Sequence, residues 1–246
     1  MSDPSAVEFQ HVFKAFGNRK VLDDVSFKVN AGEALCILGR SGTGKSVTLK
    51  LMIGLLKPDS GRVCIDSEDI ADSSEEDLSR VRRHMGFLFQ SAALFDSFTL
   101  GDNLALPLRR LDKSKSPVEI KRAVDDALER VGLNLDVAKM PSALSGGMRK
   151  RAGLARALVL HPRLLLVDEP SSGLDRITAS EIDDLLLKVK KEYGATLVIV
   201  THDVRGARRV ADQIAVLDQG SLIGFGTATE LENSHHEIVR RLVTES

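Results

Sequence analysis

The sequence contains no tryptophan, a single tyrosine and only two cysteines among its 246 residues. Cys36 and Cys64 each lie inside an apolar run and not in a paired spacing, which excludes a disulfide framework or a cysteine metal cluster; we expect buried, reduced thiols. The 34 lysines and arginines nearly balance the 35 aspartates and glutamates, leaving a formal net charge of −1. This balance disfavours a non-specific nucleic-acid binder, because no overall basic surface is available.

Long hydrophobic runs are also missing. No apolar stretch approaches the roughly 18 residues that a spanning helix needs, and residues 1–9 lack the basic-then-apolar pattern of a signal peptide. No internal repeat or low-complexity segment is visible. We therefore expect a soluble cytoplasmic chain that serves a membrane only through a partner.

A glycine-rich loop follows the apolar run at residues 34–38. Gly39, Gly42 and Gly44 lack a Cβ, so consecutive backbone N–H groups can turn toward one anion, and a helix starting at Lys45 adds the positive end of its dipole. In this Gly-x-x-x-x-Gly-Lys-Ser pattern, Lys45 is placed to reach the β- and γ-phosphates and Ser46 to ligate Mg²⁺. The loop predicts a nucleoside triphosphate site; the alternative is a strand-to-helix turn without a ligand.

Strand-like and helix-like segments alternate on both sides of a purely helical stretch. Residues 7–30 alternate in the manner of antiparallel strands, and the later apolar runs at 85–89, 163–167 and 195–200 are typical of buried parallel strands. We predict an α/β fold with a parallel sheet, an antiparallel β subdomain and an inserted α-helical subdomain. The expected division of the single domain, residues 1–246, is an α/β core at 1–90 and 161–224, helices at 91–160 and a helical tail at 225–246. Within the helical part, Pro117 suits the first turn of a helix, and the last helix is expected to begin after Gly147 and run from Met148 to Leu160.

Polar residues follow the predicted parallel strands at their carboxyl ends, where ligands bind in open parallel sheets. Asp168 suits the metal together with Ser46. Glu169 is the predicted general base. Gln90 is placed to hydrogen-bond metal-bound and attacking water, and His202 to donate to the γ-phosphate while holding the base. A single Gln or His at a strand end is more often structural, so the functional prediction rests on their convergence with the loop.

A second glycine pair occurs at Ser145-Gly146-Gly147. Ser145 suits a helix N-cap, and the two glycines leave the first-turn N–H groups bare. Residues 149–151 are basic and no acid accompanies them, which is unfavourable at the positive end of a helix unless an anion binds there. The pattern predicts a second phosphate-binding helix end; the alternative is an ordinary capped helix with a solvated basic face.

With these motifs in view, the chain resembles the nucleotide-binding subunit of an ABC transporter over nearly its whole length. Its counterparts of the family motifs are, in order, Walker A at 39–46, the Q-loop at Gln90, the ABC signature at 144–148, Walker B with its catalytic acid at 164–169, the D-loop at 172–175 and the switch histidine His202. Met148 stands where the family usually has Gln, but Ser145 and both glycines are intact, so we expect activity. Residues 39–47, 89–95 and 144–151 are similar to the Mla/Mkl-type ATPases of MCE-associated lipid transporters.

This resemblance implies the P-loop NTPase (RecA-like) sheet of the ABC ATPase fold, with ATP and Mg²⁺ as cofactors. The implied catalytic residues are Lys45, Gln90, Glu169 and His202, and the implied Mg²⁺ residues are Ser46, Gln90 and Asp168. The implied ATP-binding residues are Phe16, Gly39, Arg40, Ser41, Gly42, Thr43, Gly44, Lys45, Ser46, Val47, Ser145, Gly146 and Gly147. The resemblance places Phe16 on the adenine, although periodicity alone equally allows a turn residue folded onto the core.

The resemblance also implies partners. Two copies would enclose two ATP molecules, each phosphate loop facing the other copy's Ser145 and Gly147. A separate integral-membrane permease would bind the segment at 91–107 and hold the chain at the cytoplasmic face of the membrane. Leu94, Phe95 and Phe98 suit such a contact, and buried core is an equal alternative for each.

The cargo implied by the Mla/Mkl resemblance is phospholipid or a related lipid, moved in a complex that includes an MCE-type lipid-binding protein. Three alternatives remain at this level. One is an importer ATPase for another substrate, and another is a soluble assembly factor of the Fe–S cluster type. The third, a nucleic-acid-linked ABC protein, is disfavoured because such proteins need a long coiled-coil insertion or two ABC modules in one chain.

Overall fold

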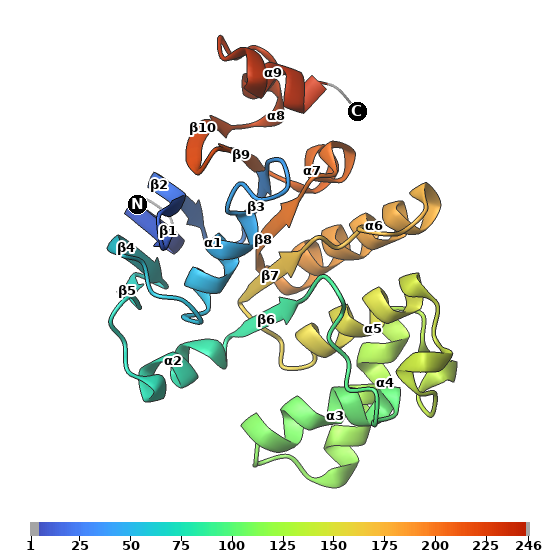
Figure 1. The fold of residues 1–246 in the computed structure, drawn as a ribbon. Coiled ribbons are helices and arrows are strands. Elements are labelled where there is room, and N and C mark those ends of the chain that lie inside the picture. Colours follow the sequence, from blue (N-terminus) through green and yellow to red (C-terminus); the bar gives the residue numbers. More distant parts are fainter. Residues whose placement is uncertain (1–4, 245–246) are drawn as a thin grey trace.

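The central sheet has six strands in the order β10-β9-β3-β8-β7-β6 (Figure 1). These data come from a computed structural model that describes residues 5–244. The strands are β3 (Ala34–Leu38), β6 (Met85–Leu88), β7 (Leu164–Asp168), β8 (Thr196–Thr201), β9 (Gln213–Asp218) and β10 (Ser221–Gly226). Only β10 runs antiparallel to its neighbour; the other five strands are parallel. Every residue of β3 and β8 is buried, as expected for central parallel strands covered on both faces.

A second sheet of four strands, in the order β2-β1-β4-β5, packs beside the first and is antiparallel throughout. Its strands are β1 (Ser5–Phe16), β2 (Arg19–Asn30), β4 (Ser60–Ile65) and β5 (Glu68–Asp69). Helix α1 (Lys45–Met52) contributes Leu49, Leu51 and Met52 to one hydrophobic core shared with both sheets. The predicted combination of a parallel sheet and an antiparallel β piece is confirmed.

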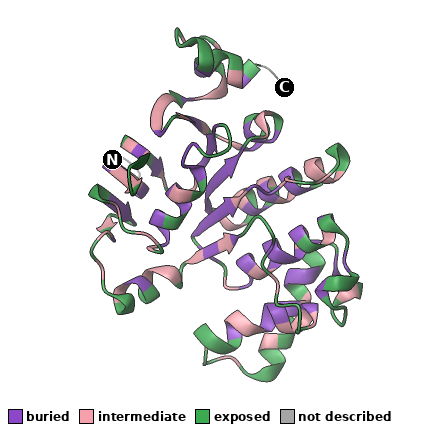
Figure 2. Ribbon diagram, viewed as in Figure 1, coloured by how far each residue is buried: buried purple, intermediate pink, exposed green. Residues whose placement is uncertain are grey.

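The opposite face of the central sheet is covered by α6 (Arg176–Tyr193) and α7 (Val204–Val210), whose apolar side chains join the sheet in a second core. The C-terminal helices α8 (Ala228–Glu232) and α9 (Glu237–Thr244) reach the same core through Leu231, Val239 and Val243. Figure 2 shows the buried central strands. Cys36 and Cys64 are both buried and unpaired, as predicted.

Helices follow β6 and form a third core of their own. After α2 (Glu75–Arg82) and β6 come α3 (Leu100–Leu111), α4 (Pro117–Arg130), the short turns η1 (Asn134–Asp136) and η2 (Pro141–Ala143), and α5 (Gly146–Leu158). Pro117 occupies the first turn of α4, as predicted, behind a capping box of Ser116 and Glu119. The last helix starts two residues before the predicted Met148, because both glycines belong to its first turn, and it ends at Leu158, two residues before the predicted Leu160.

Within residues 5–244, no helix is long and apolar enough to cross a membrane.

Candidate functional site

The glycine-rich loop joins the end of β3 to the start of α1. Gly42 and Gly44 have φ angles of 83° and 104°, in the left-handed region that a side chain disfavours. A Cβ on Gly44 would also stand 2.7 Å from the Val21 carbonyl oxygen of β2. The chain can therefore make this turn only with glycine, and the first N–H groups of α1 face the loop.

Lys45 begins α1 and is only 7% exposed. Its Nζ donates to the carbonyl oxygens of Gly39 and Arg40, at 2.7 Å and 3.1 Å, and lies 3.8 Å from Glu169 Oε1. Burial lowers the pKa of Lys45, while the Glu169 and Asp168 carboxylates act in the opposite direction. The result is a buried cation at the base of the loop, with donor capacity suited to a phosphate.

Ser46 and Asp168 connect the loop to the end of β7. The Ser46 hydroxyl donates to Asp168 Oδ1 at 3.3 Å. Burial raises the pKa of Asp168, and the Ser46 hydrogen bond partly offsets this effect. Across the described part of the chain, no three His, Cys, Asp or Glu side chains group closely enough to hold a metal alone. Two hard oxygens that need further ligands from a phosphate and water fit Mg²⁺.

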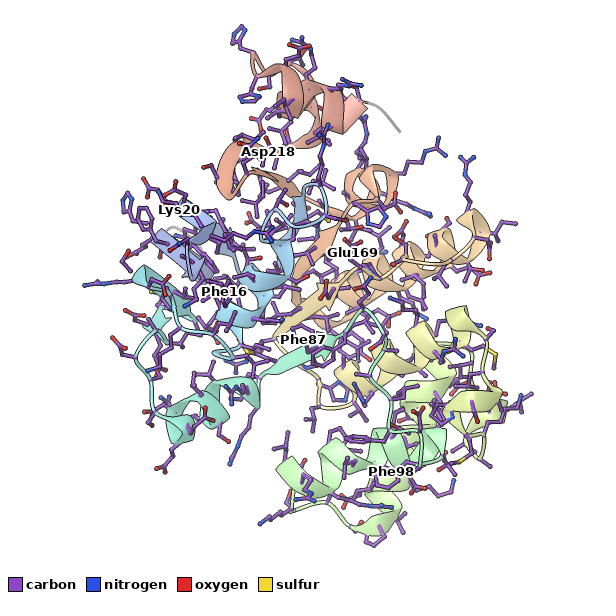
Figure 3. All side chains as sticks on the ribbon, in the orientation of Figure 1. Phe16, Lys20, Phe87, Phe98, Glu169 and Asp218 are labelled. Atoms are coloured by element: carbon purple, nitrogen blue, oxygen red, sulfur yellow. The ribbon has the colours of Figure 1, made fainter. Side chains whose placement is uncertain are left out.

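Glu169 is held in an unusual backbone conformation directly after β7. Its φ of 47° is left-handed, and its N–H donates to the Val200 carbonyl of β8 at 2.9 Å. Its Oε2 accepts from the His202 backbone N–H at 3.3 Å and lies 2.8 Å from His202 Nδ1. Glu169 lies at the centre of the molecule (Figure 3). Its carboxylate is largely buried, whereas most of the His202 side chain is exposed. Strain of this kind at a strand end is typical of functional sites.

Gln90 comes two residues after β6 and is exposed. Its Nε2 lies 3.4 Å from Ser172 Oγ, in the turn after Glu169. The neighbouring strands β6 and β7 thus place this amide beside the predicted base.

An open hollow of about 420 Å³ lies in front of these groups. It is lined by Phe16, Arg19, Val21, Ser41, Gly42, Gly44, Lys45, Ser46, Val47, Gln90, Glu169 and His202. Phe16 is 49% exposed, so of the two alternatives for this ring the structure shows the exposed one. The hollow therefore joins a solvent-facing aromatic ring, the phosphate loop and the polar strand ends.

Several residues named by the sequence lie elsewhere. Gly39, Arg40, Thr43 and Asp168 belong to the same loop and strand end but do not line the hollow. Ser145 caps α5, and Gly146 and Gly147 form its first turn, also outside the hollow. Ser145 and Gly146 are exposed, whereas Gly147 is buried against Thr178 of α6.

The basic start of α5 differs from the sequence-based expectation. Arg149, Lys150 and Arg151 donate to the carbonyl oxygens of Leu144, Glu169 and Val131, respectively. Each cation therefore has a partner inside the chain, so their presence does not by itself require an external anion.

Three residues near the strand ends are not predicted from the sequence. Arg19 and Val21, at the start of β2, line the hollow, and Arg19 Nη2 donates to the Gly42 carbonyl at 3.3 Å. Their place just after the turn that carries Phe16 was the available signal. Lys150 resembles its basic neighbours in the sequence, and nothing there marks it as buried beside Glu169.

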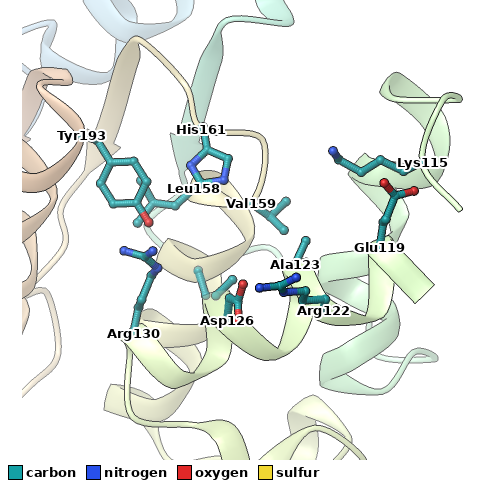
Figure 4. A pocket seen from close by; sticks show the side chains of 12 residues that line it. Lys115, Glu119, Arg122, Ala123, Asp126, Arg130, Leu158, Val159, His161 and Tyr193 are labelled. Carbon is teal, nitrogen blue, oxygen red and sulfur yellow. The ribbon is translucent and has the colours of Figure 1, made fainter. Parts of the chain in front are cut away.

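A second hollow of about 190 Å³ lies between α4, the end of α5 and the end of α6 (Figure 4). His161 and Tyr193 stand on one side of it, with their ring centroids 5.4 Å apart. None of the predicted site residues lines this hollow, so the chemistry considered above is confined to the strand ends.

Comparison with known proteins agrees with this geometry. Residues 22–172 match the family model described as ABC transporter. The chain is 44% identical over 238 residues to the probable ribonucleotide transport ATP-binding protein mkl of Mycobacterium leprae, covering 97% of this chain and 68% of that protein. It is 38% identical over 245 residues to the methionine import ATP-binding protein MetN of Corynebacterium diphtheriae, covering 98% and 72%.

Solved structures show the same fold. The ATP-binding cassette MJ0796, in a dimeric post-hydrolysis state bound to ADP and Pi, superposes with a TM-score of 0.83 at 33% identity, covering 90% of this chain and 98% of that one. CbiO1 of Clostridium perfringens, part of the ABC transporter complex cbiONQ, gives a TM-score of 0.86 at 29% identity, covering 99% and 96%. The chain therefore belongs to the ABC transporter ATP-binding proteins, and it is an ATPase that hydrolyses ATP to drive transport.

Proposed function

We propose that ATP binds in the hollow of about 420 Å³ and that Glu169 is the general base for its hydrolysis. The observation that carries this proposal is the position of the Glu169 carboxylate, with His202 Nδ1 at 2.8 Å and Lys45 Nζ at 3.8 Å. Lys45 and the N–H groups of residues 39–47 bind the phosphates, and Phe16 stacks on the adenine.

In this proposal Glu169 accepts the proton of a water that attacks the γ-phosphate, and His202 holds the carboxylate in place. Gln90 orients that water from the neighbouring strand end. Ser46 and Asp168, with Gln90 beside them, would hold Mg²⁺, which when bound neutralises part of the phosphate charge.

The active unit we propose is a dimer. Each copy's exposed Ser145 and Gly146, with Gly147 behind them, face the phosphate loop of the other copy. The dimeric state of the related cassette MJ0796 supports this arrangement. ATP binding closes the dimer and hydrolysis releases it.

A membrane permease is the proposed partner of the segment at 91–107, which would hold the chain at the cytoplasmic face of the membrane. Phe95 and Phe98 are 50% and 37% exposed and lie with ring centroids 5.6 Å apart, whereas Leu94 packs on the core of the helical stretch. A mainly apolar groove of about 600 Å³ between α3 and α4 adjoins this surface. Exposed aromatic rings beside an apolar groove suit a short amphipathic helix of the permease.

Phospholipid or a related lipid is the cargo we propose, moved together with an MCE-type lipid-binding protein. The support is the Mla/Mkl-type sequence of the phosphate loop, the segment after Gln90 and the start of α5. The relatives themselves carry the names of ribonucleotide and methionine transport proteins. Isolating the native complex and identifying copurified lipids by mass spectrometry tests the cargo; a complex that carries only a polar solute would refute it.

The site proposal is tested with Glu169→Gln. This variant should bind ATP as the wild type does, lose nearly all turnover and accumulate dimers in the presence of ATP. Glu181→Gln, an exposed acid on α6, is the matched control and should behave as wild type. Normal hydrolysis by Glu169→Gln would show that another group is the base.

A further inference from the structure

Helix α5 carries a buried cation that contacts the backbone of Glu169. Lys150 is 6% exposed, and its Nζ donates to the Glu169 carbonyl oxygen at 2.7 Å. Lys150 and Gly153 are three residues apart and therefore lie on one face of the helix. A Cβ on Gly153 would come within 2.9 Å of Leu88 at the end of β6, so this face packs directly on the strand edge.

The Lys150 hydrogen bond is made to Glu169, whose backbone is in the left-handed region. A non-glycine residue at a φ of 47° is strained and persists in that conformation only because surrounding contacts fix it. The Glu169 N–H is fixed by Val200, and its carbonyl accepts from Lys150 Nζ and, at 3.3 Å, from the Ser172 N–H. With its N–H and its carbonyl both held, the Glu169 main chain is fixed at the point from which the carboxylate projects.

The charge of Lys150 is not used in an ion pair, since within residues 5–244 no carboxylate lies within 4.0 Å of its Nζ. Burial lowers the pKa of Lys150, and the Asp168 and Glu169 carboxylates oppose that effect. A buried ammonium whose hydrogen bond goes to a carbonyl is expensive to desolvate, and an apolar side chain would fill the same space more favourably. Stability alone therefore does not explain this residue.

We propose that Lys150 is a positioning residue for hydrolysis: through the Glu169 carbonyl it ties the start of α5 to the orientation of the general base. This inference rests on the proposed role of Glu169. It also gives α5 two functions in one copy, because Ser145 at its cap faces the other copy's ATP while Lys150, one turn later, holds its own copy's base.

The test is Lys150→Met in the full chain, which removes the donor and the charge but keeps most of the volume. The expected result is a loss in kcat of about tenfold to a hundredfold with KM for ATP changed less than about threefold, as for a slightly misplaced group. Dimers formed with ATP should persist longer, since binding is intact and hydrolysis is slow. Arg151→Met, which removes another cation-to-carbonyl bond of α5 at Val131, is the matched control and should keep the wild-type kcat.

The decisive comparison repeats Lys150→Met in the Glu169→Gln background, measured by single-turnover hydrolysis of labelled ATP. With no base left to position, the second substitution should cause no further loss. An unchanged kcat in the wild-type background, or the same fold-loss in both backgrounds, would overturn the inference. Should Lys150→Met fail to fold, Lys150→Gln is put through the same comparison. If Glu169→Gln hydrolyses ATP at the wild-type rate, Glu169 is not the general base and the proposed function is refuted. If Glu169→Gln is inactive but Lys150→Met keeps the wild-type kcat, only the role of Lys150 is refuted.

Discussion

Among single residues, Asp183 links pH to stability through its unusual surroundings. It lies on α6, is 7% exposed, and faces Asp203 at the start of α7. A Cβ on Gly206 would stand 3.0 Å from Asp183 Oδ1 and 3.1 Å from Asp203 Oδ2, so both carboxylates share the space over this glycine. Burial, with Asp203 and Asp184 adding to it and Arg209 opposing it, raises the pKa of Asp183 to about 6.

Because of this raised pKa, we expect Asp183→Asn to increase the free energy of unfolding by an amount that depends on pH. The folded pKa is raised above the unfolded value, so the folded state binds more protons between about pH 4 and pH 6, and stability falls as the pH rises through that window. Two pKa units correspond to about 3 kcal/mol. Asp183→Asn should therefore raise the free energy of unfolding by up to about 3 kcal/mol at pH 7.5 and change it little at pH 4.

Urea unfolding at both pH values measures this effect, with Glu181→Gln as the control from the exposed side of the same helix. A difference between Asp183→Asn and the wild type that does not depend on pH would contradict the assignment.

Between elements, one buried side chain of α3 fixes the loop before it. Asn103 is fully buried and its amide donates to the carbonyl oxygens of Phe95, Phe98 and Thr99, while its Oδ1 accepts from the Phe95 N–H. These four bonds hold the two exposed phenylalanines in place. The proposed permease surface therefore depends on a residue that does not itself reach the surface.

Asn103→Ala should destabilise the chain by about 2–4 kcal/mol, since it leaves several buried backbone groups unpaired. Amide hydrogen exchange should accelerate at residues 95–99, with a smaller effect on ATP turnover by the isolated chain. Asn134→Ala, at an exposed position of η1, serves as the control and should change neither quantity. Unaltered exchange at 95–99 would show that Asn103 does not order this loop.

The sequence predicted elements well where burial follows from a continuous pattern. The parallel strands around residues 163–167 and 195–200 each contain at least four consecutive apolar residues, and Pro117 marks the start of α4 by its missing N–H. The strand-end residues Gln90, Glu169 and His202 could be predicted together, because the carboxyl ends of parallel strands lie at one edge of the sheet. The burial of Lys150 and Asp183 was not predicted, because it depends on how their helices pack against strands that are distant in sequence. In the sequence, each looks like an ordinary charged residue on the polar face of an amphipathic helix.

For the molecule as a whole, the exposed aromatic pair is expected to set partner binding without affecting catalysis. Replacing Phe95 and Phe98 together with Ser should reduce recovery of the permease in an affinity purification of the complex by about tenfold or more, as for loss of interface hot spots. ATP turnover by the isolated chain should stay near the wild-type value.

Phe225→Ser is the control for this prediction. Phe225 is 42% exposed on β10, which forms one edge of the central sheet, whereas β6, which leads into the helical stretch, forms the opposite edge (Figure 1). Full recovery of the permease with the double variant would place the docking surface elsewhere.

At the scale of the assembly, we propose that the phosphate loop at residues 39–46 is half of a site, which the exposed Ser145 end of α5 in a second copy completes. The most direct test measures ATP turnover per chain over a dilution series while light scattering follows the dimer fraction in the same samples. Turnover per chain should fall in proportion to the dimer fraction. Monomers that hydrolyse ATP as fast per chain as dimers would contradict it.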